Sequence, residues 1–159
     1  MTEAPTLTGQ DIGEAQGALR ALLDTVLVEA GTTGNEYIVM RILAVRGPLA
    51  SPTEFREYLA TQRQLDLDPS GVAELLGGLE AGGIIAGSSP DGPGPVRLTD
   101  RGQARYEALA AAVMPITTEL YGDLDPDDLA TAHRVLVELT QRAVRMSSRS
   151  TASGRPPTL

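Results

Sequence analysis

The stretch from Asp68 to Pro95 constrains the fold of this chain more than any other part of its sequence. Asp68 followed by Pro69 predicts a helix start, because Asp accepts hydrogen bonds from the first free amides and Pro suits the first helical turn. Four apolar residues then recur at helical spacing and define one buried face. They are Val72, Leu75, Leu76 and Leu79. Gly82-Gly83 ends the helix, and two short strands around a Pro- and Gly-rich tip at residues 88–95 predict a hairpin.

A second helix is predicted immediately before this one. Ser51-Pro52, followed by Glu54, forms the same kind of start signal. The helix that it opens is expected to end at about Gln64. Leu65-Asp66-Leu67 then has the length of the turn that joins the two helices of a helix-turn-helix. The sequence therefore predicts a helix-turn-helix followed by a β-hairpin.

Helical patterns flank this unit on both sides. Apolar residues at steps of three and four predict one helix over about 11–30 and another from Tyr37 to Val45. Thr99 or Asp100 is expected to cap a long helix, which Pro115 should kink or break. Asp125-Pro126 is expected to begin the last helix.

The expected organisation is a single domain with two loose ends. The domain covers residues 11–146, with the helix-turn-helix and hairpin at about 35–100 and flanking helices at about 11–30 and 101–146. Residues 1–10 are expected to be flexible, and the Ser-, Gly- and Pro-containing residues 147–159 to be disordered. The length of 159 residues suits one core, and with 1 Phe and 4 Tyr that core must come from aliphatic residues. The fold class is therefore mainly α with a small β-hairpin.

The chain is acidic, with 13 basic and 21 acidic residues and a formal net charge of −8. Residues 51–100 contain 3 Arg and 8 acidic residues, a local net charge of −5. Opposite the apolar stripe of the helix that follows Asp68 lie Ser70, Glu74, Gly77 and Ala81, and that helix contains no Arg or Lys. A nucleic-acid-binding surface usually has the opposite sign, because basic side chains neutralise phosphates.

Composition also limits the compartment and the chemistry. The chain has no Cys, so that disulfides, thiolate nucleophiles and thiolate metal sites are excluded. The first residues lack the pattern of a signal peptide, and no apolar run reaches about 18 residues. We expect a soluble, cytoplasmic protein without a membrane partner or a cofactor.

Several passages resemble the MarR family of winged-helix regulators. Leu98-Thr99-Asp100-Arg101-Gly102 resembles the LTDxG signature at the end of the wing. Asp68-Pro69-Ser70-Gly71-Val72 resembles the opening of the recognition helix, and the run from Leu79 to Ile85 resembles the LExxGLI passage into the wing. Two connections, Arg46-Gly47-Pro48-Leu49 and Leu124-Asp125-Pro126-Asp127-Asp128-Leu129, are also similar. The resemblance covers about Asp11 to Arg145.

This resemblance implies a winged helix-turn-helix flanked by N- and C-terminal dimerisation helices. It further implies a homodimer that regulates transcription, with double-stranded DNA as partner and a small molecule as effector. Each recognition helix would enter a major groove and each wing a minor groove.

The DNA-binding hypothesis depends on a small set of side chains. Four Arg residues are candidates for phosphate contacts, and one Ser is a candidate for a phosphate or a base edge. They are Arg56, Arg63, Arg97, Arg101 and Ser70. The alternative for each Arg is a surface residue paired with a nearby acid.

The alternative hypothesis is a winged-helix protein that no longer binds DNA and instead binds or converts a small molecule, or binds a protein partner. In MarR-like proteins, small ligands lie in the crevice between the dimerisation helices and the winged helix. The matching positions here are Tyr37, Met40, Arg41, Tyr106 and Met114. Arg41 would bind an anion and the Tyr hydroxyls would orient it. Alternatively, Tyr37 and Met40 are ordinary core residues.

The inventory of acid and base groups disfavours an enzyme. His133 is the sole His and is expected to pack or to lie at an interface. The Asp residues at 123–128 do not match a calcium loop, because Asp128 stands where Gly is needed and Arg134 where Glu is needed. Helix capping explains them better. If a reaction occurs, Glu74, Asp91 and the Tyr and Arg residues of the crevice are the candidates.

Overall fold

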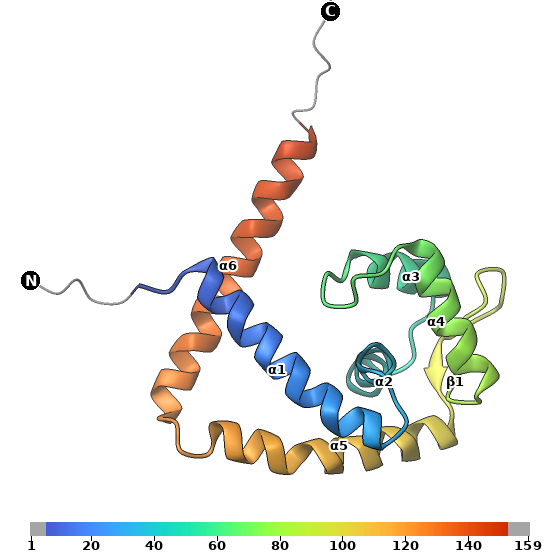
Figure 1. The fold of residues 1–159 in the computed structure, drawn as a ribbon. Helices are drawn as coiled ribbons and strands as arrows, with labels where there is room; N and C mark the ends of the chain where they lie inside the picture. Colours follow the sequence, from blue (N-terminus) through green and yellow to red (C-terminus); the bar gives the residue numbers. More distant parts are fainter. Residues whose placement is uncertain (1–5, 153–159) are drawn as a thin grey trace, which may run out of the picture. The chain divides into compact units, whose positions relative to one another are not determined.

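The computed structural model describes residues 6–152, and these fall into two units, one up to Pro115 and one from Ile116. Its elements confirm the predicted mainly α fold with a small hairpin (Figure 1). They are α1 (Gly9–Glu29), α2 (Gly34–Arg46), α3 (Pro52–Thr61), α4 (Pro69–Ala81), β1 (Ile85–Ala86), β2 (Arg97–Leu98), α5 (Asp100–Tyr121) and α6 (Pro126–Ala152).

The helices begin where side chains cap their free amides. Ser51 accepts a hydrogen bond from the Glu54 amide and Asp68 from the Gly71 amide, so that both predicted helix starts are confirmed. α1 and α2 open with capping boxes at Thr8 and Thr33, in which an acid three residues on returns a hydrogen bond. These caps place both helix starts a few residues earlier than the apolar pattern indicates.

The predicted helix-turn-helix is present as α3, a turn and α4. α3 ends at Thr61, short of the expected Gln64, and Leu65 in the turn is buried. The apolar stripe of α4 packs into a core with α2, α3 and the hairpin. Its buried members are Val39, Leu43, Phe55, Leu59, Leu65, Val72, Leu76, Leu79, Ile85 and Val96. Burial of this stripe fixes which face of α4 points outward.

The hairpin that follows α4 is the wing. β1 and β2 pair antiparallel, with Ile85 opposite Leu98. Immediately before β2, Val96 exchanges two backbone hydrogen bonds with Leu49, of 2.8 and 2.9 Å. The sequence did not predict this bridge, which attaches the wing to the segment between α2 and α3.

The start of α5 is locked to the exit of α4. The Thr99 hydroxyl donates to the Gly83 carbonyl at 2.5 Å and accepts from the Gly102 amide at 3.0 Å. A Cβ on Gly102 would overlap the Ile84 carbonyl group. This close approach gives a physical reason for Gly at the end of the Leu98–Gly102 motif.

A second core cluster joins α1, α2 and α5 through Leu27, Tyr37, Met40 and Leu109. Arg20 adds polar links from α1, donating to Asn35 on α2 and to the Gln64 carbonyl. These contacts hold α1, α2 and the first part of α5 as one unit around the winged helix.

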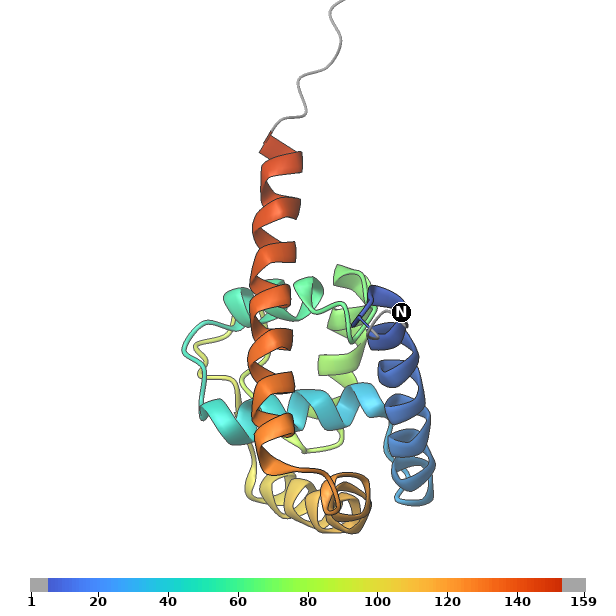
Figure 2. The ribbon, with the colours of Figure 1, turned by 90° about the vertical axis from the view of Figure 1, so that its left-hand side faces the viewer.

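The second unit contains the end of α5 and all of α6. α5 continues through Pro115, so that the helix is not broken there. α6 is one continuous helix to Ala152 (Figure 2). Residues 147–152, which were expected to be disordered, are therefore helical in the structure. Residues 153–159 and 1–5 lie outside the described residues.

α6 carries an apolar stripe with alternating steps of three and four. Its members are Leu129, Ala132, Leu136, Leu139, Ala143 and Met146. Such spacing is typical of a helix that pairs with another helix. Within residues 6–152, no helix combines the length and apolar character that a membrane span needs.

Candidate functional site

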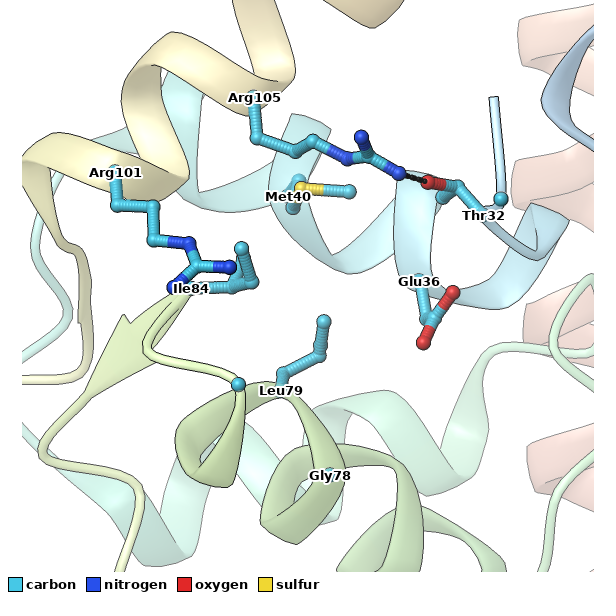
Figure 3. A pocket seen from close by; sticks show the side chains of 10 residues that line it. Thr32, Glu36, Met40, Gly78, Leu79, Ile84, Arg101 and Arg105 are labelled. Atoms are coloured by element: carbon cyan, nitrogen blue, oxygen red, sulfur yellow. Dashed lines mark hydrogen bonds between the residues drawn. The ribbon is translucent and has the colours of Figure 1, made fainter. Parts of the chain in front are cut away.

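A pocket of about 470 Å³ lies between α2, α4 and the start of α5. Its walls come from the α1–α2 turn, from the end of α4 and from α5 (Figure 3). The lining residues are Gly31, Thr32, Glu36, Met40, Gly78, Leu79, Gly82, Ile84, Arg101 and Arg105. Both the volume and the mixture of apolar and charged groups suit a small organic ligand.

The two Arg side chains of the pocket differ in their partners. Arg105 Nη2 donates to the Ala30 carbonyl and to Thr32 Oγ1, the latter at 2.6 Å, and so ties α5 to the α1–α2 turn. The Arg101 side chain makes no hydrogen bond or ion pair with any other part of residues 6–152. A guanidinium without an internal partner is free to bind an incoming anion.

One of the five predicted ligand-binding residues lines the pocket. Met40 is buried and lines it, whereas Arg41 and Met114 are exposed and lie outside it. Tyr37 and Tyr106 stack on each other, with ring centroids 6.1 Å apart. Burial raises the pKa of the Tyr37 phenol; Tyr106 adds to that shift, and Arg41 opposes it. The two Tyr rings therefore support α2 and α5 beside the pocket.

The five predicted DNA-binding residues also take different positions. Arg63 in the α3–α4 turn, Ser70 near the start of α4 and Arg97 on β2 are exposed. Arg101 is exposed but faces the pocket. The residues that remain on the outer surface of the winged helix are thus Arg63, Ser70 and Arg97.

Arg56 is half-buried at the base of the wing. Its Nε donates to the Ser88 carbonyl at 2.9 Å. Ser88 is 1% exposed, and its hydroxyl donates to the carboxylate of Glu80, which also accepts from the Gly87 amide at 3.3 Å. Arg56 and Glu80 therefore hold the first residues of the wing between α3 and α4.

The outward face of α4 is smooth and carries acid. Gly77 is exposed there, and a Cβ on it would meet no atom within 4 Å apart from the neighbouring backbone of α4 itself. Glu74 is exposed on the same helix, and its side chain makes no hydrogen bond or ion pair within residues 6–152. This face presents little to a phosphate backbone.

Sequence reasoning missed several residues of the pocket. Thr33 and Glu36 form a capping box whose Thr-x-x-Glu signature is visible in the sequence and would have placed Glu36 on the first turn of α2. Arg105 and Thr32, 73 positions apart, are joined only by the tertiary fold, so that no local pattern indicates their contact.

Asp125, which precedes α6, has a structural role as a helix cap. Asp125 Oδ1 accepts from the amides of Asp127 and Asp128 at 2.7 and 3.3 Å, which confirms the capping interpretation. Over residues 6–152 no group of three or more His, Cys, Asp or Glu side chains is arranged to hold a metal ion. His133 is exposed on α6, where its expected interface role stays a prediction.

A helix-turn-helix, a wing and long flanking helices define the winged-helix class of proteins. Within that class, the fold is that of the MarR-family regulators, as comparison with solved structures shows. No family model matches the chain, and no curated protein matches it.

Three of these solved structures show the extent of the likeness. The MarR-family protein Rv2887 of Mycobacterium tuberculosis in complex with DNA is 26% identical, with 84% of this chain and 98% of that chain covered and a TM-score of 0.60. The complex of Rv2887 with p-aminosalicylic acid is 25% identical, with 84% of this chain and 99% of that chain covered and a TM-score of 0.61. NadR in complex with 4-hydroxyphenylacetate is 22% identical, with 87% of this chain and 97% of that chain covered and a TM-score of 0.66.

Proposed function

We propose that this protein is a ligand-responsive transcriptional regulator that binds double-stranded DNA as a homodimer. The observation that carries the proposal is a complete winged helix whose α4 also forms one wall of a ligand-sized pocket. A ligand in that pocket would touch the helix that is expected to enter the major groove. Binding of the ligand and of DNA would therefore be coupled.

The DNA-binding part of the proposal uses the outward polar groups that remain. Arg63 and Arg97 flank α4 on the turn before it and on the wing strand after it, and Ser70 lies on its first turn. A dimer would present each of these groups twice. Four guanidiniums per dimer support phosphate contacts, although fewer than a typical regulator offers.

The homodimer is supported by the exposed apolar stripe of α6. Leu136 and Leu139 are each 41% exposed in the single chain. Exposed apolar side chains at coiled-coil spacing are usually covered by another helix. We therefore assign the stripe to a second copy of this chain.

Light scattering after size-exclusion chromatography tests the homodimer. The wild-type protein is expected to elute as a dimer and Leu136→Glu as a monomer, because a charge would enter the paired stripe. Val137→Glu is the matched control, since Val137 is equally exposed at 41% but lies about 100° around α6 from Leu136, outside the stripe. A monomeric wild-type protein would refute the dimer.

A salt-titrated gel shift with the DNA around the gene that encodes the protein tests the DNA-binding function. A specific complex should form at low salt and weaken steeply as salt rises, because each arginine–phosphate contact releases counterions. Absence of a shift at low salt would remove DNA from the proposal.

A second candidate function is a winged-helix protein that binds a small molecule without binding DNA. The observation that favours it is the outward face of α4, which carries the acid Glu74 and where Gly77 offers no donor beyond the backbone. This candidate predicts ligand binding without any gel shift, whereas the first predicts both.

A further inference from the structure

The pocket beside α4 carries opposite charges on different walls. Arg101 projects from the first turn of α5, and Glu36 from the first turn of α2. Figure 3 shows their charged groups on opposite sides of the pocket, with Leu79 between them. Both residues line the pocket, so that a ligand in it meets both charges.

Each of these two side chains has unused binding capacity. Glu36 Oε2 accepts from the Thr33 amide at 2.8 Å, while Oε1 receives no donor from elsewhere in residues 6–152. Arg101 has no polar partner in that part of the chain, whereas the Nη2 group of Arg105 is already occupied by Thr32 and Ala30. The pocket thus offers the Arg101 guanidinium without a polar partner and one Glu36 carboxylate oxygen without a donor. Arg105 adds a second positive charge, because the groups that hold it are neutral.

The remaining surface between these charges is apolar. Met40 from α2, Leu79 from α4 and Ile84 from the exit of α4 contribute it. An anionic ligand without a cationic group would bring its apolar end, or a second anion, toward the Glu36 carboxylate. That carboxylate would then lose water without gaining a partner, which is unfavourable.

We propose that the pocket binds a small zwitterion, with its acid group on Arg101, its ammonium group on Glu36 and an apolar body on Met40, Leu79 and Ile84. This inference rests on the proposed ligand pocket and specifies the class of its ligand. Arg101 would favour ligands with an acid group, and Glu36 would disfavour those that have an acid group but no ammonium group.

Isothermal titration of the full chain with three probes of similar size tests the proposal. The probes are 4-(aminomethyl)benzoate, which has both charges, 4-methylbenzoate, which lacks the amine, and 4-methylbenzylamine, which lacks the acid. The zwitterion is expected to bind at least about fivefold more tightly than either of the others, since each partly exposed ion pair contributes modestly. Equal affinity for the zwitterion and 4-methylbenzoate, or no binding of any probe, would overturn the proposal.

Two variants separate the roles of the charges. Glu36→Gln keeps an oxygen for the Thr33 amide, so that the capping box is preserved while the charge is lost. It is expected to bind the zwitterion and 4-methylbenzoate about equally. Arg101→Gln is expected to weaken the binding of both carboxylate probes and to leave the binding of 4-methylbenzylamine unchanged. An unchanged preference in Glu36→Gln would contradict the assignment of Glu36.

The titration does not involve DNA, so that its outcome is independent of the gel shift. A zwitterion preference without a gel shift would support this inference and refute the regulatory function. A gel shift without a zwitterion preference would do the reverse.

Discussion

The two sides of α4 differ in what they offer to a binding partner. Its outward surface carries Ser70, Glu74, Gly77 and exposed small residues, with cations only on the neighbouring turn and strand. On its pocket side, Gly78 and Leu79 face Arg101, Arg105 and Glu36 from two other helices. Charged groups are therefore concentrated where a small molecule binds and are sparse where a duplex would.

The two faces of one helix are therefore under different structural constraints. The buried stripe of α4 fixes its orientation, so that the outward face tolerates Gly and acid without loss of the fold. The pocket side depends on three elements at once, and each must be held in register. Changes on the pocket side are therefore expected to have larger effects on ligand binding than changes on the outward side.

The largest effect is expected for Gly102→Ala. The added Cβ would overlap the Ile84 carbonyl and separate the start of α5 from the exit of α4. We expect a loss of about 3 kcal/mol in the free energy of unfolding, measured by urea denaturation. A loss below about 1 kcal/mol would show that this contact is not tight.

Glu80 and Glu74 form a matched pair on α4. Glu80→Ala would leave the buried Ser88 hydroxyl and the Gly87 amide without their acceptor and should cost about 1–3 kcal/mol. Glu74→Ala should change the free energy of unfolding by less than about 0.5 kcal/mol, because Glu74 is exposed. Equal costs in urea denaturation would break the contrast between the wing anchor and the outward face.

Gly77→Ala and Gly78→Ala should each stabilise the protein. Each new Cβ would enter open space, and Ala is favoured over Gly in a helix by roughly 1 kcal/mol. Gly78 lines the pocket and Gly77 does not. Urea denaturation should therefore show a gain in both, while titration with 4-(aminomethyl)benzoate should show altered affinity in Gly78→Ala alone. A ligand effect of the same size in Gly77→Ala would contradict the pocket boundary.

The smallest effect concerns Tyr37. Burial raises its pKa above the ordinary value of a tyrosine, so the folded state holds the phenol proton more tightly than the unfolded state does. This stabilisation is present below about pH 10 and is lost as the pH rises through the folded pKa. Tyr37→Phe should therefore lose less stability than the wild type between neutral pH and pH values above 10, in thermal unfolding followed by circular dichroism. Identical pH profiles would refute the shift.

Local signals in the sequence predicted the elements, and tertiary contacts decided the site. Caps such as Asp68 and Asp125 and the apolar stripe of α4 act within a few residues, so their helices could be predicted. The Arg105–Thr32 contact and the Leu49–Val96 bridge join distant segments and left no local pattern. For the same reason no local pattern indicated the hydrogen bond between Arg56 Nε and the Ser88 carbonyl.

The salt dependence of DNA binding is the decisive test of the proposed regulatory function. Fluorescence anisotropy with a labelled fragment from upstream of the encoding gene should give a slope of log affinity against log salt of about −4, from Arg63 and Arg97 in each subunit of a dimer. Arg63→Gln combined with Arg97→Gln should abolish most of that slope. Saturable, salt-dependent binding that this double variant loses is the predicted result. Absence of binding down to about 50 mM salt, or a slope that the double variant leaves unchanged, would contradict the account.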